Sequence, residues 1–477
     1  MAINRIFQWL GNSFLILSLV LAITSVLGLM TGEPKMAAMF ASYTIGICLL
    51  GLVLVFSTRL MPARESFTEA LMFLVIFWII VPLTMAPPFY FAGVTESGIA
   101  AYFESVSAFT TTGASTLKAA ELPETLLIYR SLLQWCGGVA VATFAVVILA
   151  AINLKGTGVH RSLLFTYRKG ELFKRLASVC LLVASIYGAI SAICFVALLL
   201  SGTPLFEAFC LSLTSVSTGG LAPRDGPLEF YVNGIGLFAL CISCLLGAFN
   251  IAVIWDFFRN FSFTELRQLM TNVEHRAIYV IIAILIVIGC FYTDFRHVRT
   301  VTTEAIFFAT GTGFDYHVIG LDIVPPVILI SLALIGGSAL STTGGLKIIR
   351  ILLLFRHLTT GMDRLTHPSR VVPVVFRGVH LPDSAFLSIW MYFFGYTLVF
   401  GMGIMALAAA GMEFPMAVTS SAASVANFGP LLDVTLPPYG YESFSDLQLS
   451  ISAFLMLIGR IEVLAAFAFL SPGLWRA

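Results

Sequence analysis

The chain has 477 residues, of which 59% are apolar and 11% charged, and its mean hydropathy is +0.97. Soluble domains carry about 25% charged residues, so the composition excludes a soluble protein and indicates a polytopic membrane protein. The net charge of +1 gives no overall positive field, which argues against a nucleic-acid partner. The eight cysteines are expected to fill space in apolar runs, and the seven histidines lie in hydrophilic connections without metal-ligand spacing.

Two apolar runs open the chain and predict a pair of transmembrane helices within residues 1–66. They cover Phe14–Met30 and Ala37–Phe56, and each is close to the length of about 20 residues that a span requires. The first run, flanked by Arg5, also fits a signal peptide. Because the second run follows after only six residues, an uncleaved helical hairpin is favoured.

The rest of the chain divides into four units, each an apolar helix, a short polar re-entry and a second apolar helix. The predicted units are 67–160, 161–262, 263–372 and 373–477. Their predicted helices are Leu71–Phe91 and Leu127–Leu154, Leu176–Leu200 and Val232–Phe257, Ala277–Phe291 and Val324–Phe355, and Phe386–Ala410 and Leu447–Leu470. We therefore expect an all-α membrane protein with ten spanning helices, in which four pseudo-symmetric units surround a central pore.

Each re-entry contains a short segment that ends in glycine, and SAFTTTGAST at Ser107–Thr116 is its clearest copy. The four candidate ion-binding segments are Thr110, Thr111, Thr112 and Gly113; Val216, Ser217, Thr218 and Gly219; Thr310, Gly311, Thr312 and Gly313; and Ala426, Asn427, Phe428 and Gly429. The closing glycines lie 106, 94 and 116 residues apart. A near-even period of this kind indicates internal repetition.

Backbone of this kind is tolerated at membrane depth only inside protein or along a water-filled path. Glycine permits positive φ, so successive carbonyls can turn toward one axis. Four such segments around an axis would form a ring of oxygens that replaces the water around a cation. The plainer alternative is four polar loops that only connect helices.

Three of the stretches before the re-entries carry an acid near their start, at Glu104, Glu207 and Glu304. An acid in the first turn suits a helix N-terminus, and Thr303 adds a possible capping hydroxyl. The C-terminal ends of these short helices would then aim partial negative charge at the centre, which favours a cation there. The same acids also fit positions that simply face the outer water.

Basic residues gather in the connections on one side of the predicted membrane. That side holds Arg59, Arg64, Lys155, Arg161, Arg168, Lys169, Lys174, Arg175, Arg259, Arg267, Arg276, Arg356, Arg364, Arg370 and Arg377, and the other holds Lys35, Lys118, Arg130, Arg224, Arg296 and Arg299. Because Lys and Arg mark cytoplasmic connections, both termini are expected in the cytoplasm. The glycine loops would then enter from outside.

The second helix of each unit repeats a pair of residues, Gly137-Gly138, Gly247-Ala248, Gly336-Gly337 and Gly459-Arg460. Close helix packing explains the first two pairs. In the third unit GGSALSTTGGLKIIR breaks the helix, which predicts a flexible plug across the inner cavity; a glycine kink without a gating role is the alternative. The candidate gate residues are Gly336, Gly337, Ser341, Thr342, Thr343, Gly344, Gly345 and Lys347.

Arg460 places a charge inside the last spanning helix, and intramembrane charges are costly and usually functional. It would either weaken ion binding enough for ions to leave, or hold the plug by donating to its carbonyls. Glu462 is two residues away and does not share its helix face. The remaining alternative is a structural ion pair with an acid on another helix.

Taken together, these segments resemble the potassium transporter superfamily that includes bacterial Trk and Ktr and plant HKT proteins, and the TrkH-type membrane subunit most of all. The resemblance spans all four units. It is carried by SAFTTTGAST, Arg130 with QWCGG, STGGL, GTGF, GGSALSTTGGLKIIR, NFGP and IGRIEVL.

The resemblance implies a potassium filter built from the four glycine loops, a gate at Gly336–Lys347 and a critical arginine at Arg460. It also implies a homodimer in the bacterial inner membrane, associated with a separate cytoplasmic ring of nucleotide-binding domains. Glycine in all four loops accompanies potassium preference, whereas serine in the first loop accompanies sodium transport in some plant relatives. Gly311 and Ala426 depart from the threonine and asparagine that are frequent in the family, and this bears on the potassium-over-sodium ratio.

We therefore expect potassium uptake through a gated, channel-like pore and no enzymatic activity, because no paired acids or His/Ser/Asp cluster lies within the spans. The carbonyls expected to replace the water around the ion belong to Thr111, Thr112, Ser217, Thr218, Gly311, Thr312, Asn427 and Phe428. A potassium symporter coupled to protons or sodium is the first alternative. A membrane scaffold or regulator that transports nothing is the second.

Overall fold

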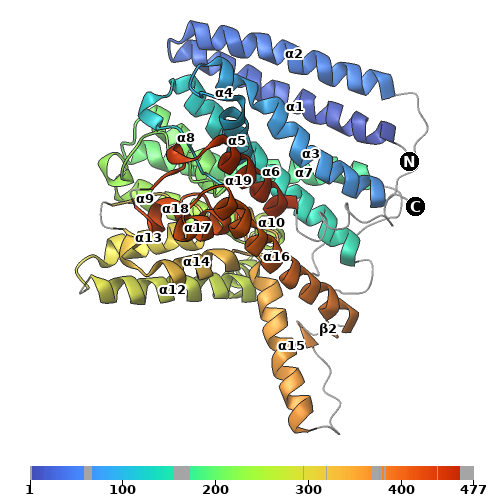
Figure 1. The fold of residues 1–477 in the computed structure, drawn as a ribbon, viewed down its shortest axis with the longest axis vertical. Helices are drawn as coiled ribbons and strands as arrows, with labels where there is room; N and C mark the ends of the chain where they lie inside the picture. Colours follow the sequence, from blue (N-terminus) through green and yellow to red (C-terminus); the bar gives the residue numbers. More distant parts are fainter. Residues whose placement is uncertain are drawn as a thin grey trace.

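The computed structural model is almost entirely helical. It describes residues 3–58, 67–153, 172–293, 295–317, 320–367, 375–376, 379–380, 383–437 and 439–461. Within these ranges the strands β1 (Val375–Phe376) and β2 (Val379–His380) form one short antiparallel pair. Figure 1 shows a bundle of helices from which α15 projects at one end. The predicted all-α membrane architecture is confirmed.

Helices α1 (Ile3–Met30) and α2 (Pro34–Thr58) form the predicted N-terminal hairpin along one edge of the molecule (Figure 1). The two helices meet closely at Gly11 and Gly51, where a Cβ atom on either glycine would lie 2.9 Å from the carbonyl oxygen of the other. Helix α1 also contacts α3 and α6. The hairpin is therefore attached to the first pore unit.

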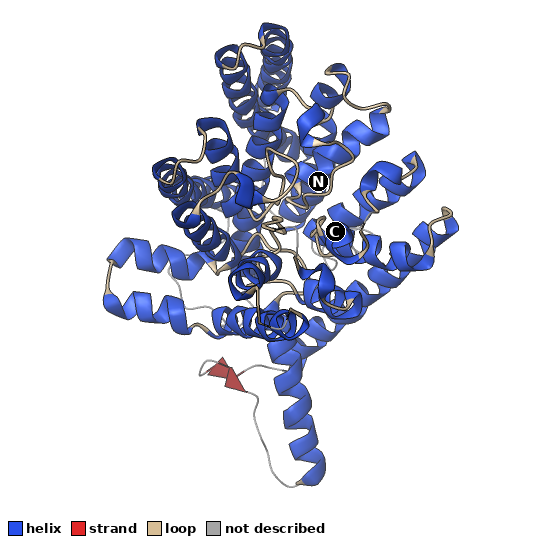
Figure 2. Ribbon diagram, turned by 90° about the vertical axis from the view of Figure 1, so that its left-hand side faces the viewer, coloured by secondary structure: helices blue, strands red, loops and turns tan. Residues whose placement is uncertain are grey.

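A long helix, a twelve-residue helix, a loop and a further helix then follow one another four times. The first group contains α3 (Phe67–Met85), α4 (Pro87–Phe91), α5 (Gly98–Phe109) and α6 (Glu124–Asn153), and the second contains α7 (Leu172–Leu200), α8 (Leu205–Val216), α9 (Gly234–Ala248), α10 (Ile251–Asn260) and α11 (Phe263–Thr271). The third group contains α12 (Val273–Tyr292), α13 (Val298–Ala309), α14 (Pro326–Ile335) and α15 (Ile348–Thr366), and the fourth contains α16 (Asp383–Ala409), α17 (Phe414–Val425), α18 (Leu431–Thr435) and α19 (Asp446–Ile461). A 3₁₀ turn precedes the second helix of each group, at η1 (Ala119–Glu121), η3 (Leu228–Phe230), η4 (Leu321–Ile323) and η5 (Tyr441–Ser443). In Figure 2 loops converge near the middle of the molecule. The bounds of the four predicted units stay predictions.

The structure contains fewer uninterrupted spans than the ten predicted. Seven helices in the described ranges are long and apolar enough to cross a membrane, or eight if one bent pair counts as a span. The predicted helix Val232–Phe257 is this bent pair, because α9 and α10 are bent by 112° relative to each other. Helix α14 stops after ten residues at the predicted break. Helix α19 is described to Ile461, so the end of the predicted Leu447–Leu470 lies outside the described residues.

The bend between α9 and α10 is stabilised by polar groups that replace the missing helical hydrogen bonds. The Asn250 side chain accepts from the Ala252 N–H at 3.0 Å, and the Asn250 N–H donates to His275 Nε2 at 2.9 Å. The His275 ring stacks on Phe249 with centroids 4.0 Å apart. His275 is fully buried, so the expectation that the histidines lie in hydrophilic connections is wrong here. The bend frees a buried backbone donor that needs an acceptor.

Glycines in three second helices allow those helices to touch the C-terminal ends of the twelve-residue helices. A Cβ atom on Gly137, Gly247 or Gly459 would lie 1.8, 2.3 or 2.4 Å from the carbonyl oxygen of Phe109, Val216 or Val425, respectively. No side chain fits at such distances. The packing role predicted for the first two glycine pairs is therefore correct, and Gly459 shares it.

Candidate ion-conducting site

The four twelve-residue helices end in the same way, and this ending shapes each glycine loop. The second loop residue is left-handed in every unit, with φ of 52° at Thr111, 51° at Thr218, 71° at Gly311 and 50° at Asn427. The next residue donates its N–H to the carbonyl five positions earlier, at 2.8 to 3.0 Å, in the pairs Thr112–Ser107, Gly219–Thr214, Thr312–Phe307 and Phe428–Ala423. This Schellman-type ending satisfies carbonyls that a helix C-terminus leaves unpaired.

This repeated geometry corrects the predicted register of the second loop by one residue. Val216 is the last residue of α8 rather than a loop residue. The segment equivalent to Thr110–Gly113 is Ser217–Gly220, and Gly220 has φ of 77°, close to the 79° of Gly113. The sequence contains two consecutive glycines there, so the motif alone gave two possible alignments. The other three predicted segments keep their register.

The structure brings the four loops together in a closed ring. A Cβ atom on Gly113 would lie 2.1 Å from the Gly219 carbonyl oxygen, and one on Gly220 would lie 2.0 Å from that of Thr312. A Cβ atom on Gly313 would meet the Phe428 ring at 2.6 Å. Each loop thus touches the next unit.

The fourth loop closes the ring on the first. The Gly429 N–H donates to the Thr112 carbonyl oxygen at 2.6 Å. That carbonyl keeps one lone pair, because a carbonyl oxygen carries two. Loops that only connect helices would not need to contact one another in this way. The close contacts between equivalent segments therefore argue against four independent connecting loops.

Side-chain hydroxyls brace two of the loops from within. Thr110 and Thr112 share a hydrogen bond of 2.7 Å between their Oγ1 atoms, and Thr310 and Thr312 share one of 3.0 Å. Asn427 Nδ2 also donates to Thr112 Oγ1 at 3.1 Å. These hydroxyls are therefore engaged with one another and orient the loop backbone.

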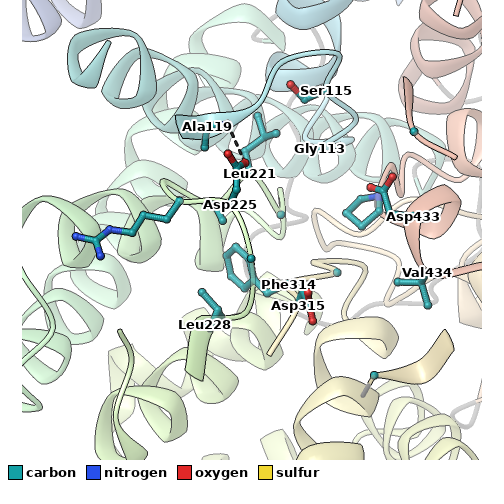
Figure 3. Close-up of a pocket in the computed structure, with 18 of the residues that line it drawn as sticks. Gly113, Ser115, Ala119, Leu221, Asp225, Leu228, Phe314, Asp315, Asp433 and Val434 are labelled. Atoms are coloured by element: carbon teal, nitrogen blue, oxygen red, sulfur yellow. Dashed lines mark hydrogen bonds between the residues drawn. The ribbon is translucent and has the colours of Figure 1, made fainter. Parts of the chain in front are cut away.

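A cavity of about 440 Å³ opens onto the ring and is lined by residues of all four units (Figure 3). Its charged lining residues are Asp225, Glu304, Asp315, Asp322, Asp433 and Glu442 against Lys118, Arg130 and Arg224. The excess of acids concentrates cations at the mouth. Burial raises the pKa of Asp433 to about 7, with Glu442 adding to the rise, so the negative charge of the cavity falls when the pH drops below neutrality.

Two of the three predicted acids lie in the middle of their helices rather than in the first turn. Helices α5 and α13 start six residues before Glu104 and Glu304, respectively. Glu104 accepts the Thr116 N–H at 2.6 Å and Glu304 accepts the Tyr316 N–H at 2.7 Å. Each carboxylate therefore binds the backbone of the segment that follows its glycine loop.

The third acid, Glu207, does lie in the first turn of its helix, where it pairs with Arg224. The predicted Thr303 cap is absent from α13, since that hydroxyl donates to the Arg299 carbonyl one turn earlier.

The segment Gly336–Lys347 joins α14 to α15 and presses against the ring. Thr342 Oγ1 lies 2.9 Å from Thr218 Oγ1, and the Thr342 N–H donates to the Gly247 carbonyl at 3.4 Å. A Cβ atom on Gly344 would lie 1.8 Å from the Ala426 carbonyl oxygen. The segment therefore contacts the second and fourth loops directly.

The same segment is fastened to itself and to α12. Lys347 Nζ donates to the carbonyls of Ser341, at 3.1 Å, and Thr343. Glu274 Oε2 accepts the Ser338 hydroxyl and the Ala339 N–H, each at 2.7 Å. The segment is thus an ordered element that fixed contacts hold in place.

Arg460 bridges the ring and this segment. Its guanidinium donates to the Thr110 carbonyl and the Thr111 hydroxyl of the first loop and to the Thr342 carbonyl. The predicted donation from Arg460 to a carbonyl of this segment is therefore present, while the plug itself stays a prediction. Within the described ranges Arg460 makes no ion pair, so the structural-pair alternative finds no support there, and Glu462 lies outside these ranges.

Sequence reasoning missed four features of the site. Gly220 directly follows Gly219, so the sequence does not show which of the two glycines closes the loop. Gln134 appears in the sequence only as the first residue of the motif QWCGG. Glu274 had no signal beyond an acid at the start of an apolar run. The acidic cavity joins loops that lie far apart in the chain, so only the fold reveals it.

The ring predicts different tolerance at two left-handed glycines. We expect Gly220→Ala to lower stability by about 1–3 kcal/mol more than Gly226→Ala, since overpacking costs that much. Both residues have positive φ, but nothing lies within 4 Å of a Cβ atom on Gly226. Thermal unfolding of the two purified variants measures the difference. Equal destabilisation would contradict the close contact between the second and third loops.

Comparison with known proteins supports the overall fold and assigns the family. A family model described as TrkH, cation transport protein, matches residues 35–472. The Trk system potassium uptake protein TrkH of Salmonella typhimurium is 30% identical over 90% of both chains, and TrkG of Escherichia coli is 26% identical over 95% of this chain and 94% of that protein. The crystal structure of the potassium transporter TrkH from Vibrio parahaemolyticus superposes with a TM-score of 0.86, at 25% identity and full coverage of both chains. The chain belongs to the TrkH family of cation transport proteins.

Proposed function

We propose that this protein carries potassium into the cell through a gated, channel-like pore. The observation that supports this most directly is the closed ring of four equivalent loops below an acidic cavity. The relatives named as potassium uptake proteins support the choice of ion. The membrane potential drives entry, at about 2.3 kcal/mol per charge per 100 mV, and potassium is the cargo of the pore.

In this proposal the loops replace the water shell of potassium with backbone carbonyl oxygens. The proposed carbonyls belong to the loops that begin at Thr110, Ser217, Thr310 and Ala426. In the second loop the shift by one residue makes Thr218 and Gly219 the equivalents of Thr111 and Thr112. The helices behind them aim their negative ends at the ring, which favours a cation. Thr111 and Thr218 have left-handed backbone angles, which are strained in residues other than glycine. Strained backbone of this kind is frequent at functional sites.

Uptake of rubidium-86 into liposomes that hold the purified protein and high internal potassium tests this function. We expect external potassium to compete strongly and sodium weakly. Gly113→Ser should raise sodium competition several-fold, since any side chain there displaces the Gly219 carbonyl. Equal competition by both ions in the wild type would reject potassium selectivity, and unchanged selectivity in Gly113→Ser would reject this filter assignment.

A coupled symporter is the second candidate, and a buried carboxylate favours it. Glu274 is fully buried and bonded to the gate segment, so a proton arriving there would alter that contact. Uptake measured at fixed voltage with and without a pH gradient separates the candidates. Flux that ignores the pH gradient excludes proton coupling, and flux that follows it excludes the simple pore.

We also propose that Gly336–Lys347 is the gate. Deleting Ser341–Gly345 should raise basal rubidium flux several-fold, because the contacts with Thr218, Ala426 and Arg460 are lost. Thr342→Val, which removes one hydroxyl contact, should raise it less. Thr359→Val on exposed α15 is the matched control. If the deletion leaves basal flux unchanged, the segment is not a gate.

A second copy of this chain is the proposed partner of α15. The helix projects from the bundle (Figures 1 and 2) and exposes one apolar stripe, formed by Phe355, Leu358, Met362 and Leu365 at 67, 50, 66 and 82% exposure. Spacings of three and four residues match the seam of a two-stranded coiled coil. Leu358→Cys should therefore cross-link into dimers in membranes, whereas Arg356→Cys should not. Equal cross-linking of both variants would reject this interface.

The chain is proposed to lie in the inner membrane with both termini in the cytoplasm, on the basis of its basic connections. A C-terminal reporter that works only in the cytoplasm checks this orientation. Residues 154–171, which hold four of the basic residues, lie outside the described ranges. A separate cytoplasmic ring of nucleotide-binding domains remains the proposed regulator, because the chain has no GxGxxG motif of its own.

A further inference from the structure

The third residue of the second loop differs from its equivalents. The position is threonine in the first and third loops, at Thr112 and Thr312, but glycine in the second, at Gly219. Gly219 is not left-handed, unlike its neighbours Thr218 and Gly220. Backbone conformation therefore does not explain why the residue is glycine.

The space beside Gly219 is filled by the side chain of Gln134 from α6 of the first unit. A Cβ atom on Gly219 would lie 2.4 Å from Gln134 Cδ, 2.5 Å from Oε1 and 2.6 Å from Nε2. Gln134 Nε2 donates to the Gly219 carbonyl oxygen at 2.7 Å. Any larger residue at 219 would displace this amide.

The amide replaces a brace that the second loop lacks. In the first and third loops the hydroxyl of the third residue bonds to that of the first residue. The first hydroxyl of each of these loops also donates back to the carbonyl four positions earlier, at 2.7 Å from Thr110, 3.0 Å from Ser217 and 2.9 Å from Thr310. Only the second loop has no third-residue hydroxyl to bond to the first, because Gly219 has no side chain. Gln134 thus supplies from another unit the polar contact that Thr112 and Thr312 supply within their own loops.

Burying the Gln134 amide costs more free energy than burying an apolar side chain of similar size would cost. Gln134 is 0% exposed, and its Oε1 has no hydrogen-bond partner among the described residues. An apolar side chain of similar size would fill the site without burying an unpaired oxygen. The Gly219 carbonyl that the amide fixes is the atom against which Gly113 packs.

We propose that Gln134 is a positioning residue for ion selectivity, which holds the second loop in the ring through the Gly219 carbonyl. This inference rests on the proposed function, because selectivity has meaning only for a conducting pore. The residue acts on the ion through the loop and does not touch the ion itself.

The test measures rubidium uptake and the ratio of potassium to sodium competition in liposomes. Gln134→Met should keep the protein folded and conducting but lower the ratio about tenfold, and Gln134→Glu, which replaces the donor with an acceptor, should lower it as well. Gln448→Met is the matched control, because Gln448 Nε2 also donates to a backbone carbonyl, that of Ala410, away from the ring. Its ratio should stay at the wild-type value.

A reciprocal exchange makes the test specific. Gly219→Thr alone should abolish uptake by collision with the amide. Gln134→Ala with Gly219→Thr should recover uptake and part of the selectivity, because the second loop then resembles the first and third. This rescue is not expected if Gln134 only fills space.

The outcomes distinguish failure of the proposed function from failure of the proposed role of Gln134. A wild type that does not discriminate potassium from sodium rejects the proposed function. A selective wild type with an equally selective, folded Gln134→Met rejects the role of Gln134. If Gln134→Met fails to fold, the exchange decides, since recovery by the double variant supports the brace and absence of recovery overturns it.

Discussion

The need to satisfy backbone polar groups at membrane depth governs this structure. Four short helices stop inside the molecule, where no bulk water is available to the carbonyls of their last turns. The Schellman-type endings satisfy part of this demand, and they require a left-handed residue at the second position after each helix. The same endings set the direction of the glycine loops, so the closed ring follows from the way in which the helices end.

The interior also contains a charge that joins two parts of the molecule. Arg460 is 8% exposed, and it donates to the first loop and to the gate segment. Among the described residues, two carbonyls and a hydroxyl satisfy the guanidinium without an acid. Because one side chain contacts both elements, the first loop and the segment Gly336–Lys347 share a hydrogen-bonding partner.

The four units are alike at the ring and differ below it. The second helix is continuous in the first unit, bent at Asn250 in the second and interrupted in the third. Two consecutive residues of α12 serve both irregular places, because His275 accepts the Asn250 N–H and Glu274 accepts from the gate segment. Ile251 and Leu340 add a direct backbone hydrogen bond of 3.2 Å between them. The broken symmetry therefore forms one connected region beside the nearly symmetric ring of loops.

Hydrophobic run length and local glycine and hydroxyl content were enough to predict the hairpin, most of the helices, the re-entries and the break at Gly336. The sequence also singled out Arg460, since a charge in an apolar run is conspicuous. The register at Gly219 and Gly220 follows from the backbone angles at the end of α8, since the glycine doublet alone fits two alignments. The bend at Asn250 and the partners of Gln134 and Glu274 depend on contacts between residues 25 to 85 positions apart, and chain-local patterns carry no information about such contacts.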